Sequence, residues 1–360
     1  MTRSAQALFT PFTIKGITLP NRIVMAPMTR SKSPGGVPGE DVAAYYRRRA
    51  DGGVGLIITE GTYPPHPAAG FDPNVPRLYG EAALNGWRRV VDQVHAVGGH
   101  IFSQIWHLGL QVSSGPAPQK GQHAVGPSGE FAMTKSDIDA VVQAYGQAAQ
   151  SARDVGFDGI ELHGAHGYLI DQFFWEKTNQ RTDGYGGGLV NRTRFAVEAI
   201  QEVRRRVGPD YPLALRFSQW KIGFYDAKLA ATPAELDQFL KPMVDAGVDI
   251  FHCSTRRFWE PEFEGSDLNL AGWTKKLSGK PTITVGSITL AADLMTSFGA
   301  PEVIPVTGVD ELLDRLERGE FDLVAVGRAL IANPDWPLKI QAGAIEQLRP
   351  FDRGVLASLL

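Results

Sequence analysis

The sequence contains a single cysteine, Cys253, among 360 residues. One thiol cannot form a disulfide within the chain, and it cannot supply the four thiolates that bind an iron–sulfur cluster. We therefore expect a protein of the reducing cytoplasm that carries neither a disulfide nor such a cluster.

Long apolar runs and an excess of one charge are also missing. No apolar run approaches the roughly 20 residues of a membrane-spanning helix. The first ten residues have neither the apolar core nor the cleavage site of a signal peptide. The 36 basic and 39 acidic side chains leave a net charge of -3, and the only basic runs, 47–49 and 204–206, are typical of solvated helix faces. We expect neither a membrane nor a nucleic-acid partner.

Glycine ends several of the predicted helices, and the same pattern recurs along the chain. A helix-like stretch ends at glycine and continues into a β-rich run at Gly53, Gly99, Gly156 and Gly247. Glycine favours the left-handed conformation that ends many helices. Eight short runs rich in Val, Ile and Leu are typical of parallel strands that are covered on both faces. They are residues 23–28, 56–61, 100–107, 159–164, 213–218, 249–255, 281–286 and 323–328.

Helical periodicity lies between most of these runs. Residues 136–155 place apolar side chains at three- and four-residue spacings, and Ser136 with Asp139 resembles a capping box. A second helix is expected to begin after Thr232, with Pro233 first and Glu235 completing its box, and to end at Gly247. Strands that alternate with helices eight times predict an α/β fold, the (β/α)8 TIM barrel.

The remaining segments fit one barrel. An open doubly wound sheet is less favoured, because no strand is followed by the G-x-G-x-x-G turn of dinucleotide-binding domains. Residues 12–19, centred on Gly16, predict a short N-terminal hairpin that closes the barrel bottom. The stretches 33–39, 113–129 and 184–188 are rich in glycine, proline or both and predict loops. With no linker visible, residues 1–360 are expected to form a single domain.

Active sites of such barrels lie at the C-terminal ends of the strands. Hydrogen-bonding groups, glycines and aromatic rings gather at these ends, which a purely structural barrel would not require. They are Ala26, Pro27, Thr29, Gly61, Gln104, Trp106, His163, His166, Tyr168, Arg216, Gly286, Ser287, Gly327 and Arg328. The last four predict a phosphate site or, equally well, two tight turns and a surface arginine.

Residues 163–168, with sequence His-Gly-Ala-His-Gly-Tyr, form the sharpest local feature. Two histidines that are close in sequence can ligate zinc, but no carboxylate or cysteine follows at a spacing typical of a zinc site. Three buried polar rings in a plain core would each need a partner. A pair of donors for an electron-poor oxygen fits this pattern better.

These motifs together resemble the Old Yellow Enzyme family over most of the chain. They are Ala26-Pro27-Met28-Thr29-Arg30, Glu60-Gly61, Gln104-Ile105-Trp106-His107, His163 to Phe173, Asp183-Gly184-Tyr185-Gly186-Gly187, Arg216 and Val326-Gly327-Arg328. The resemblance implies an FMN-dependent ene-reductase. In such enzymes NADPH or NADH reduces FMN, and hydride then passes to the β-carbon of an enone, enal or nitroalkene, with protonation at the α-carbon. Nitro compounds and nitrate esters are further substrates that it implies.

The resemblance also implies roles for individual residues. Tyr168 would supply the proton, and His163 and His166 would bind the substrate oxygen, with Trp106 and Trp259 near the substrate. The cofactor would be bound by Ala26, Pro27, Thr29, Gly61, Gln104, Arg216, Gly286, Ser287, Gly327 and Arg328. A small-molecule substrate is the expected partner, and a monomer and a homodimer both remain open.

The chain departs from the family pattern at two places. Ser218-Gln219-Trp220 replaces the usual Ser-Pro, and the tail, 348–360, lacks the tyrosine that often lines the pocket. Two other functions remain as alternatives. A Schiff-base barrel enzyme using Lys221 would leave the histidine pair unexplained, and a flavin-binding sensor without turnover would not need Tyr168.

Overall fold

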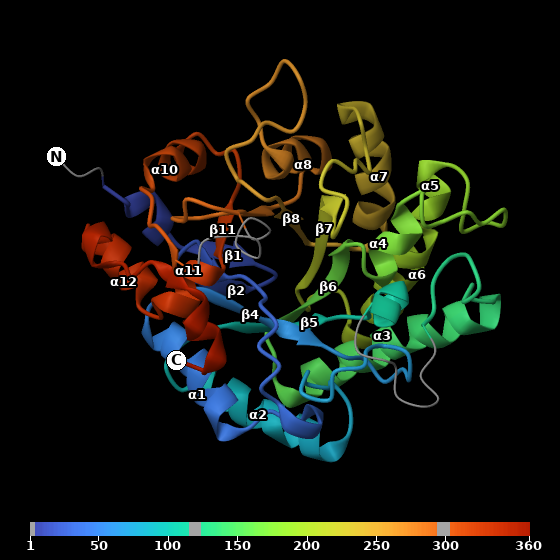
Figure 1. The fold of residues 1–360 in the computed structure, drawn as a ribbon, viewed down its shortest axis with the longest axis horizontal. Helices are drawn as coiled ribbons and strands as arrows, with labels where there is room; N and C mark the ends of the chain where they lie inside the picture. Colours follow the sequence, from blue (N-terminus) through green and yellow to red (C-terminus); the bar gives the residue numbers. More distant parts are fainter. Residues whose placement is uncertain (1–3, 115–123, 294–302) are drawn as a thin grey trace.

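The computed structural model describes residues 4–114, 124–293 and 303–360. Its centre is a closed barrel of eight parallel strands in the order β11-β3-β4-β5-β6-β7-β8-β9 (Figure 1). The strands are β3 (Ile23–Met25), β4 (Leu56–Thr62), β5 (Ile101–Ile105), β6 (Gly159–His166), β7 (Leu213–Lys221), β8 (Ile250–Ser254), β9 (Thr282–Val285) and β11 (Leu323–Val326). All eight predicted strands are confirmed, and β4, β6 and β7 extend beyond their predicted ends.

Helices surround the barrel and cover the outer faces of its strands (Figure 1). The longer ones are α1 (Glu40–Asp51), α2 (Glu81–His95), α3 (Lys135–Val155), α6 (Arg194–Val207), α7 (Pro233–Ala246), α8 (Leu270–Ser278) and α10 (Asp310–Glu317). Shorter ones are α4 (Leu169–Phe174), α5 (Leu189–Arg192), α11 (Arg328–Ala332) and α12 (Trp336–Gln341). Single 3-10 turns are η1 (Gln6–Phe9), η2 (Pro34–Gly36), η3 (Gly109–Ser114), η4 (Ile345–Gln347) and η5 (Arg353–Ala357).

The two predicted helix caps have different outcomes. The α7 prediction is confirmed at both ends: the Thr232 side chain accepts from the Glu235 N–H, and Gly247 is left-handed. The Glu235 carboxylate, however, accepts from Ala231 rather than from Thr232. The capping box predicted at Ser136 is wrong, because Thr134 with Asp137 forms it two residues earlier. Both pairs share the same spacing, and the earlier cap starts the helix two residues sooner than a cap at Ser136 would.

The N-terminal hairpin is confirmed. Strands β1 (Phe12–Ile14) and β2 (Ile17–Leu19) pair antiparallel. Ile14 and Leu19 pack against apolar side chains from the first residues of the barrel strands, such as Leu56 and Phe102. The bottom of the barrel is therefore a closed apolar core, and polar side chains are left to the opposite end.

The last part of the chain folds back across α1. Strand β12 (Phe351–Asp352) pairs with β10 (Val303–Ile304). The Arg30 guanidinium donates to the carbonyl oxygens of Val355, Leu356 and Ser358. The expectation that residues 47–49 form a solvated run is wrong for Arg49, which is fully buried over the Tyr45 ring at 3.7 Å.

Two further predictions concern exposed or connecting segments. Residues 33–39 and 184–188 lie in loops, apart from the short 3-10 segment η2. Positions 115–123 of the third predicted loop fall outside the described residues. Among the helices that the structure describes, none combines the length and apolar character needed to cross a bilayer.

Candidate active site

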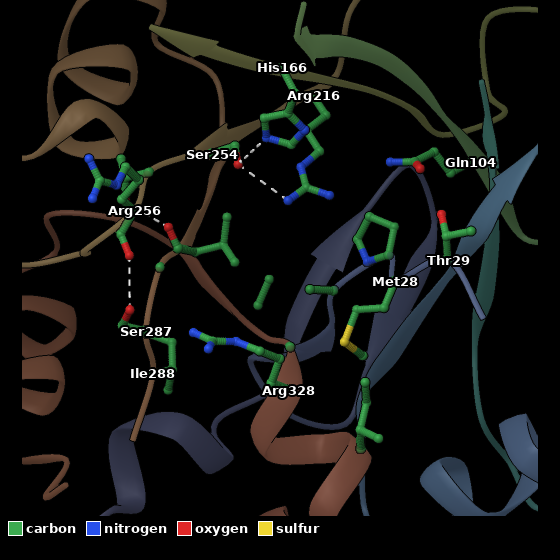
Figure 2. A pocket seen from close by; sticks show the side chains of 18 of the residues that line it. Met28, Thr29, Gln104, His166, Arg216, Ser254, Arg256, Ser287, Ile288 and Arg328 are labelled. Atoms are coloured by element: carbon green, nitrogen blue, oxygen red, sulfur yellow. Dashed lines mark hydrogen bonds between the residues drawn. The ribbon is translucent and has the colours of Figure 1, made fainter. Parts of the chain in front are cut away.

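A cavity of about 550 Å³ opens at the C-terminal ends of the barrel strands. Thirteen of the fifteen predicted site residues line it, and Figure 2 shows several of them converging from different strands. They are Ala26, Pro27, Thr29, Gln104, Trp106, His163, His166, Tyr168, Arg216, Gly286, Ser287, Gly327 and Arg328.

Gly61 and Trp259 do not line this cavity. A Cβ on Gly61 would lie 2.5 Å from the Trp106 ring, so glycine lets that ring lie directly against β4. The Trp259 ring packs edge-on against Phe258, with centroids 5.2 Å apart. The Trp259 carbonyl accepts from Arg315, which holds this segment against α10 instead of over the cavity.

Three buried polar side chains form a chain beneath the cavity. Gln104 Nε2 donates to Glu161 Oε1 at 2.7 Å, and Glu161 Oε2 lies 2.7 Å from His252 Nδ1. Burial alone would raise the pKa of Glu161, but His252, Arg216 and Gln104 stabilise the carboxylate and lower it. An ionised Glu161 orients the Gln104 amide, whose carbonyl oxygen and second N–H remain for a group in the cavity.

Arg216 provides a buried positive charge beside this chain. It is 7% exposed, and its Nε has no hydrogen-bond partner among the described residues. Its Nη2 donates to Ser254 Oγ at 3.3 Å. A buried donor without a partner costs about 1–3 kcal/mol, so this geometry suits an electron-rich ligand in the cavity.

The end of β6 and the turn that follows it direct three polar rings into the cavity. His166 and Gly167 both adopt positive φ, 66° and 84°, which reverses the backbone between His163 and Tyr168. A histidine in this left-handed region is uncommon and strained, so the surroundings must hold it. The His166 N–H donates to Ser218 Oγ at 3.0 Å and the Gly167 N–H to Asp171 Oδ2 at 2.7 Å.

The two histidines are neutral donors. Burial and the nearby Arg216 charge hold the pKa of His163 and of His166 well below the usual value. The Ala165 N–H donates to His163 Nδ1 at 3.3 Å, which places the His163 proton on Nε2. The ring centroids of the two histidines are 5.1 Å apart.

Tyr168 completes the group. Its ring centroid lies 5.0 Å from that of His163 and 5.0 Å from that of Trp106. Burial raises the pKa of Tyr168 to about 12. The phenol therefore stays protonated at neutral pH, as a general acid must before it transfers its proton.

A second set of groups lies at the other end of the cavity, as Figure 2 shows for Ser287 and Arg328. Gly286 and Ser287 adopt positive φ, 149° and 52°. A Cβ on Gly286 would lie 2.7 Å from Thr255 Oγ1, so glycine is needed at this turn. Burial lowers the pKa of Arg328 to about 10, which leaves a cation at neutral pH. Arg328 donates to the Ala292 carbonyl at 2.8 Å.

Several lining residues were missed in the sequence. Trp220, Ile222 and Ser254 line the wall beyond β7 and β8, and Phe351, Arg353 and Leu356 of the tail also line the cavity. Polar residues inside predicted strands, such as Glu161, His252 and Ser254, were a usable signal, because a purely apolar barrel interior has no place for them. The tail gave no such signal.

Comparison with known proteins agrees with this geometry. The family model described as NADH:flavin oxidoreductase / NADH oxidase matches residues 7–347. The chain is 35% identical to rice 12-oxophytodienoate reductase 7, over 92% of this chain and 87% of that protein. It is also 35% identical to the NADH oxidase of Thermoanaerobacter brockii, over 95% of this chain and 52% of that protein.

Solved structures show the same likeness. A morphinone reductase in complex with tetrahydroNAD superposes with a TM-score of 0.80 at 30% identity, covering 97% of this chain and 93% of that one. The Old Yellow Enzyme homologue from Zymomonas mobilis gives a TM-score of 0.81 at 27% identity, with coverage of 97% and 96%.

Proposed function

The chain belongs to the NADH:flavin oxidoreductase / NADH oxidase family, which includes Old Yellow Enzyme, and from this premise we propose that it reduces activated alkenes with a bound FMN. Its general activity, as a flavin oxidoreductase that uses a reduced nicotinamide, follows from the family. The observation that supports the alkene reaction is the convergence of His163, His166 and Tyr168 on one cavity that also contains Arg216.

The cavity suits FMN in the chemistry of its donors. Thr29 and Gln104 offer a hydroxyl and an amide for the polar edge of the isoalloxazine ring. Arg216 offers a buried cation whose Nε–H has no partner in the part of the chain that the structure describes. Gly286, Ser287, Gly327 and Arg328 would hold the phosphate. When bound, FMN accepts hydride from the nicotinamide and passes it to the substrate.

The two histidines would activate the substrate. An enone, enal or nitroalkene carries an oxygen on which negative charge grows as hydride reaches the β-carbon. His163 and His166 would donate to that oxygen from fixed positions, which favours the transition state over the ground state. Neutral imidazoles can do this across the neutral range without titrating.

Tyr168 would complete the reaction by protonating the α-carbon. Its ring packs edge-on against the rings of both His163 and Trp106. The walls formed by Trp106, Trp220, Ile222 and Leu356 favour a substrate with an apolar body. We include nitro compounds and nitrate esters in the proposal, because they too carry an electron-poor group with acceptor oxygens.

A spectroscopic titration tests this proposal. Purified protein is saturated with FMN, reduced anaerobically with NADH or NADPH, and then mixed with 2-cyclohexen-1-one. We expect flavin absorbance near 450 nm, roughly as for free FMN, to bleach with the nicotinamide and to return with the enone. Protein that binds no FMN, or whose absorbance does not return with any activated alkene, would overturn the proposal.

A further inference from the structure

Ser254 joins two of the groups that the proposed reaction uses. It is the last residue of β8 and is 2% exposed. Its Oγ lies 2.8 Å from His166 Nε2 and 3.3 Å from Arg216 Nη2 (Figure 2). The three side chains come from three neighbouring strands, so the contact depends on the barrel and not on local sequence.

The direction of these two hydrogen bonds follows from which of the three side chains can donate and which can accept. A guanidinium can only donate, so Ser254 Oγ accepts from Arg216. The hydroxyl has one proton of its own, and His166 Nε2 is its other neighbour among the described residues. If Ser254 instead accepted from an Nε2–H, which its second lone pair allows, its buried proton would have no acceptor among the described residues. Donation to Nε2 satisfies both atoms, and it leaves the proton of the neutral His166 ring on Nδ1.

The surrounding charges favour this neutral form. Arg216 and Lys221 approach from β7, His252 from β8 and His163 from β6 itself, and each disfavours a charged His166. Asp171 is the nearby carboxylate, and it is paired with Lys221 at 2.7 Å. Burial and charges from β6, β7 and β8 therefore oppose a second proton on the ring.

Trp220 holds both partners in place. Its indole N–H donates to the Ser254 carbonyl at 3.1 Å. Its ring lies 4.6 Å from the His166 ring at an angle of 32°. Rotation of the imidazole is therefore blocked by an aromatic ring, and movement of Ser254 is limited by the indole.

We propose that Ser254 is a positioning residue that sets the tautomer of His166, so that Nδ1–H is the donor to the substrate oxygen. The proposal rests on the proposed function for the identity of that oxygen, but the tautomer itself is a property of the protein. Together with Ala165, which places the His163 proton on Nε2, it gives each histidine one defined donor. Without the hydroxyl, no other donor to Nε2 is present among the described residues, so a proton can occupy Nε2 and the substrate loses part of one donor.

The test reads the tautomer directly. Nitrogen-15 NMR of the FMN-loaded protein distinguishes protonated from unprotonated ring nitrogens, with the His166 signals assigned by their loss in His166→Gln. We expect Nδ1 protonated in the wild type and a shift of the proton to Nε2, or a mixture, in Ser254→Ala. Ser254→Thr retains the hydroxyl and should restore the wild-type pattern. A wild-type Nε2–H, or identical spectra in Ser254→Ala, would overturn the proposal.

Kinetics provide the second measurement. Ser254→Ala should lower kcat/KM for 2-cyclohexen-1-one by about 10- to 100-fold, less than complete loss of a fixed donor. Because Ser254 also contacts Arg216, all variants are compared with FMN at saturation, and Ser254→Thr should recover most of the rate. Ser103→Ala, which removes a buried hydroxyl on β5 away from the cavity, is the matched control and should leave the rate unchanged. If the wild type reduces no alkene yet shows Nδ1–H, the proposed function fails and the assignment of Ser254 stands.

Discussion

Lys221 Nζ lies 2.7 Å from Asp171 Oδ1, and both side chains are almost completely buried beneath the turn that carries His166. Asp171 accepts from the Gly167 N–H, and Lys221 also donates to the Ser218 carbonyl. The ion pair thus links α4 to the end of β7 and holds the two residues with positive φ between them. The strained turn depends on this buried pair.

The first prediction concerns this pair. Lys221→Met leaves Asp171 buried without its cation and should lower the free energy of unfolding by about 3–5 kcal/mol. Lys221→Met combined with Asp171→Asn removes both charges, so its loss should be smaller than the sum of the two single losses. Urea unfolding of the four proteins measures the coupling. Additive losses would mean that the two charges do not stabilise each other.

The second prediction concerns the proton donor. Tyr168→Phe should slow reduction of 2-cyclohexen-1-one by about 10²- to 10⁴-fold, because the general acid is lost. Reduction of the bound flavin by NADH should stay near its wild-type rate. Stopped-flow measurement of the two half-reactions separates them. Tyr145→Phe is the control, since the Tyr145 hydroxyl is buried and unpartnered within the described residues. An equal fall in both half-reactions would contradict the role of Tyr168.

The third prediction concerns the oxygen-binding donors. His163→Ala should lower the rate of enone reduction by about 10²- to 10³-fold, the usual cost of losing one fixed donor. It should also weaken binding of 4-hydroxybenzaldehyde, whose phenolic oxygen would meet the same N–H. Titration of the flavin spectrum with this phenol measures the affinity. His95→Ala, on the outer face of α2, serves as the control, and unchanged phenol binding in His163→Ala would count against the donor pair.

The fourth prediction uses pH. Glu60 is buried behind Arg30, and burial raises its pKa to about 7 in the folded protein. Between the ordinary pKa of a glutamate and about 7, the folded state therefore keeps the Glu60 proton while the unfolded state has released it. The stability from this group is present at low pH and is lost as pH rises through about 7, at about 1.4 kcal/mol per pH unit.

Glu60→Gln should remove this dependence. The free energy of unfolding of Glu60→Gln, relative to wild type, should rise between pH 5 and pH 7 and then level off. Urea unfolding at half-unit pH steps measures the difference, so that the other titrating groups cancel. A difference that is flat over this range, or that falls, would show that Glu60 is ionised in the folded protein at acid pH.

Much of the fold was already predictable from the order of residues. The eight apolar runs and the intervening helical periods indicate a barrel because each strand must be covered on both faces. Once the barrel is accepted, the strand ends must converge, so Gln104, His163 and Arg216 could be placed at one site without coordinates. The Thr232 and Gly247 ends of α7 were also readable, because caps act over four residues.

The rest was decided by contacts that local sequence does not contain. Trp259 turns toward Phe258, and the tail lines the cavity because Arg30 binds its carbonyl groups. The sequence by itself determined that His166 belongs to the site. Only the parallel register of β6, β7 and β8, which brings His163, Arg216 and His252 side by side, decided that Ser254 sits between His166 and a cation. The direction of the Ser254 hydrogen bonds depends on both His166 and Arg216, and these two side chains meet Ser254 only in the closed barrel.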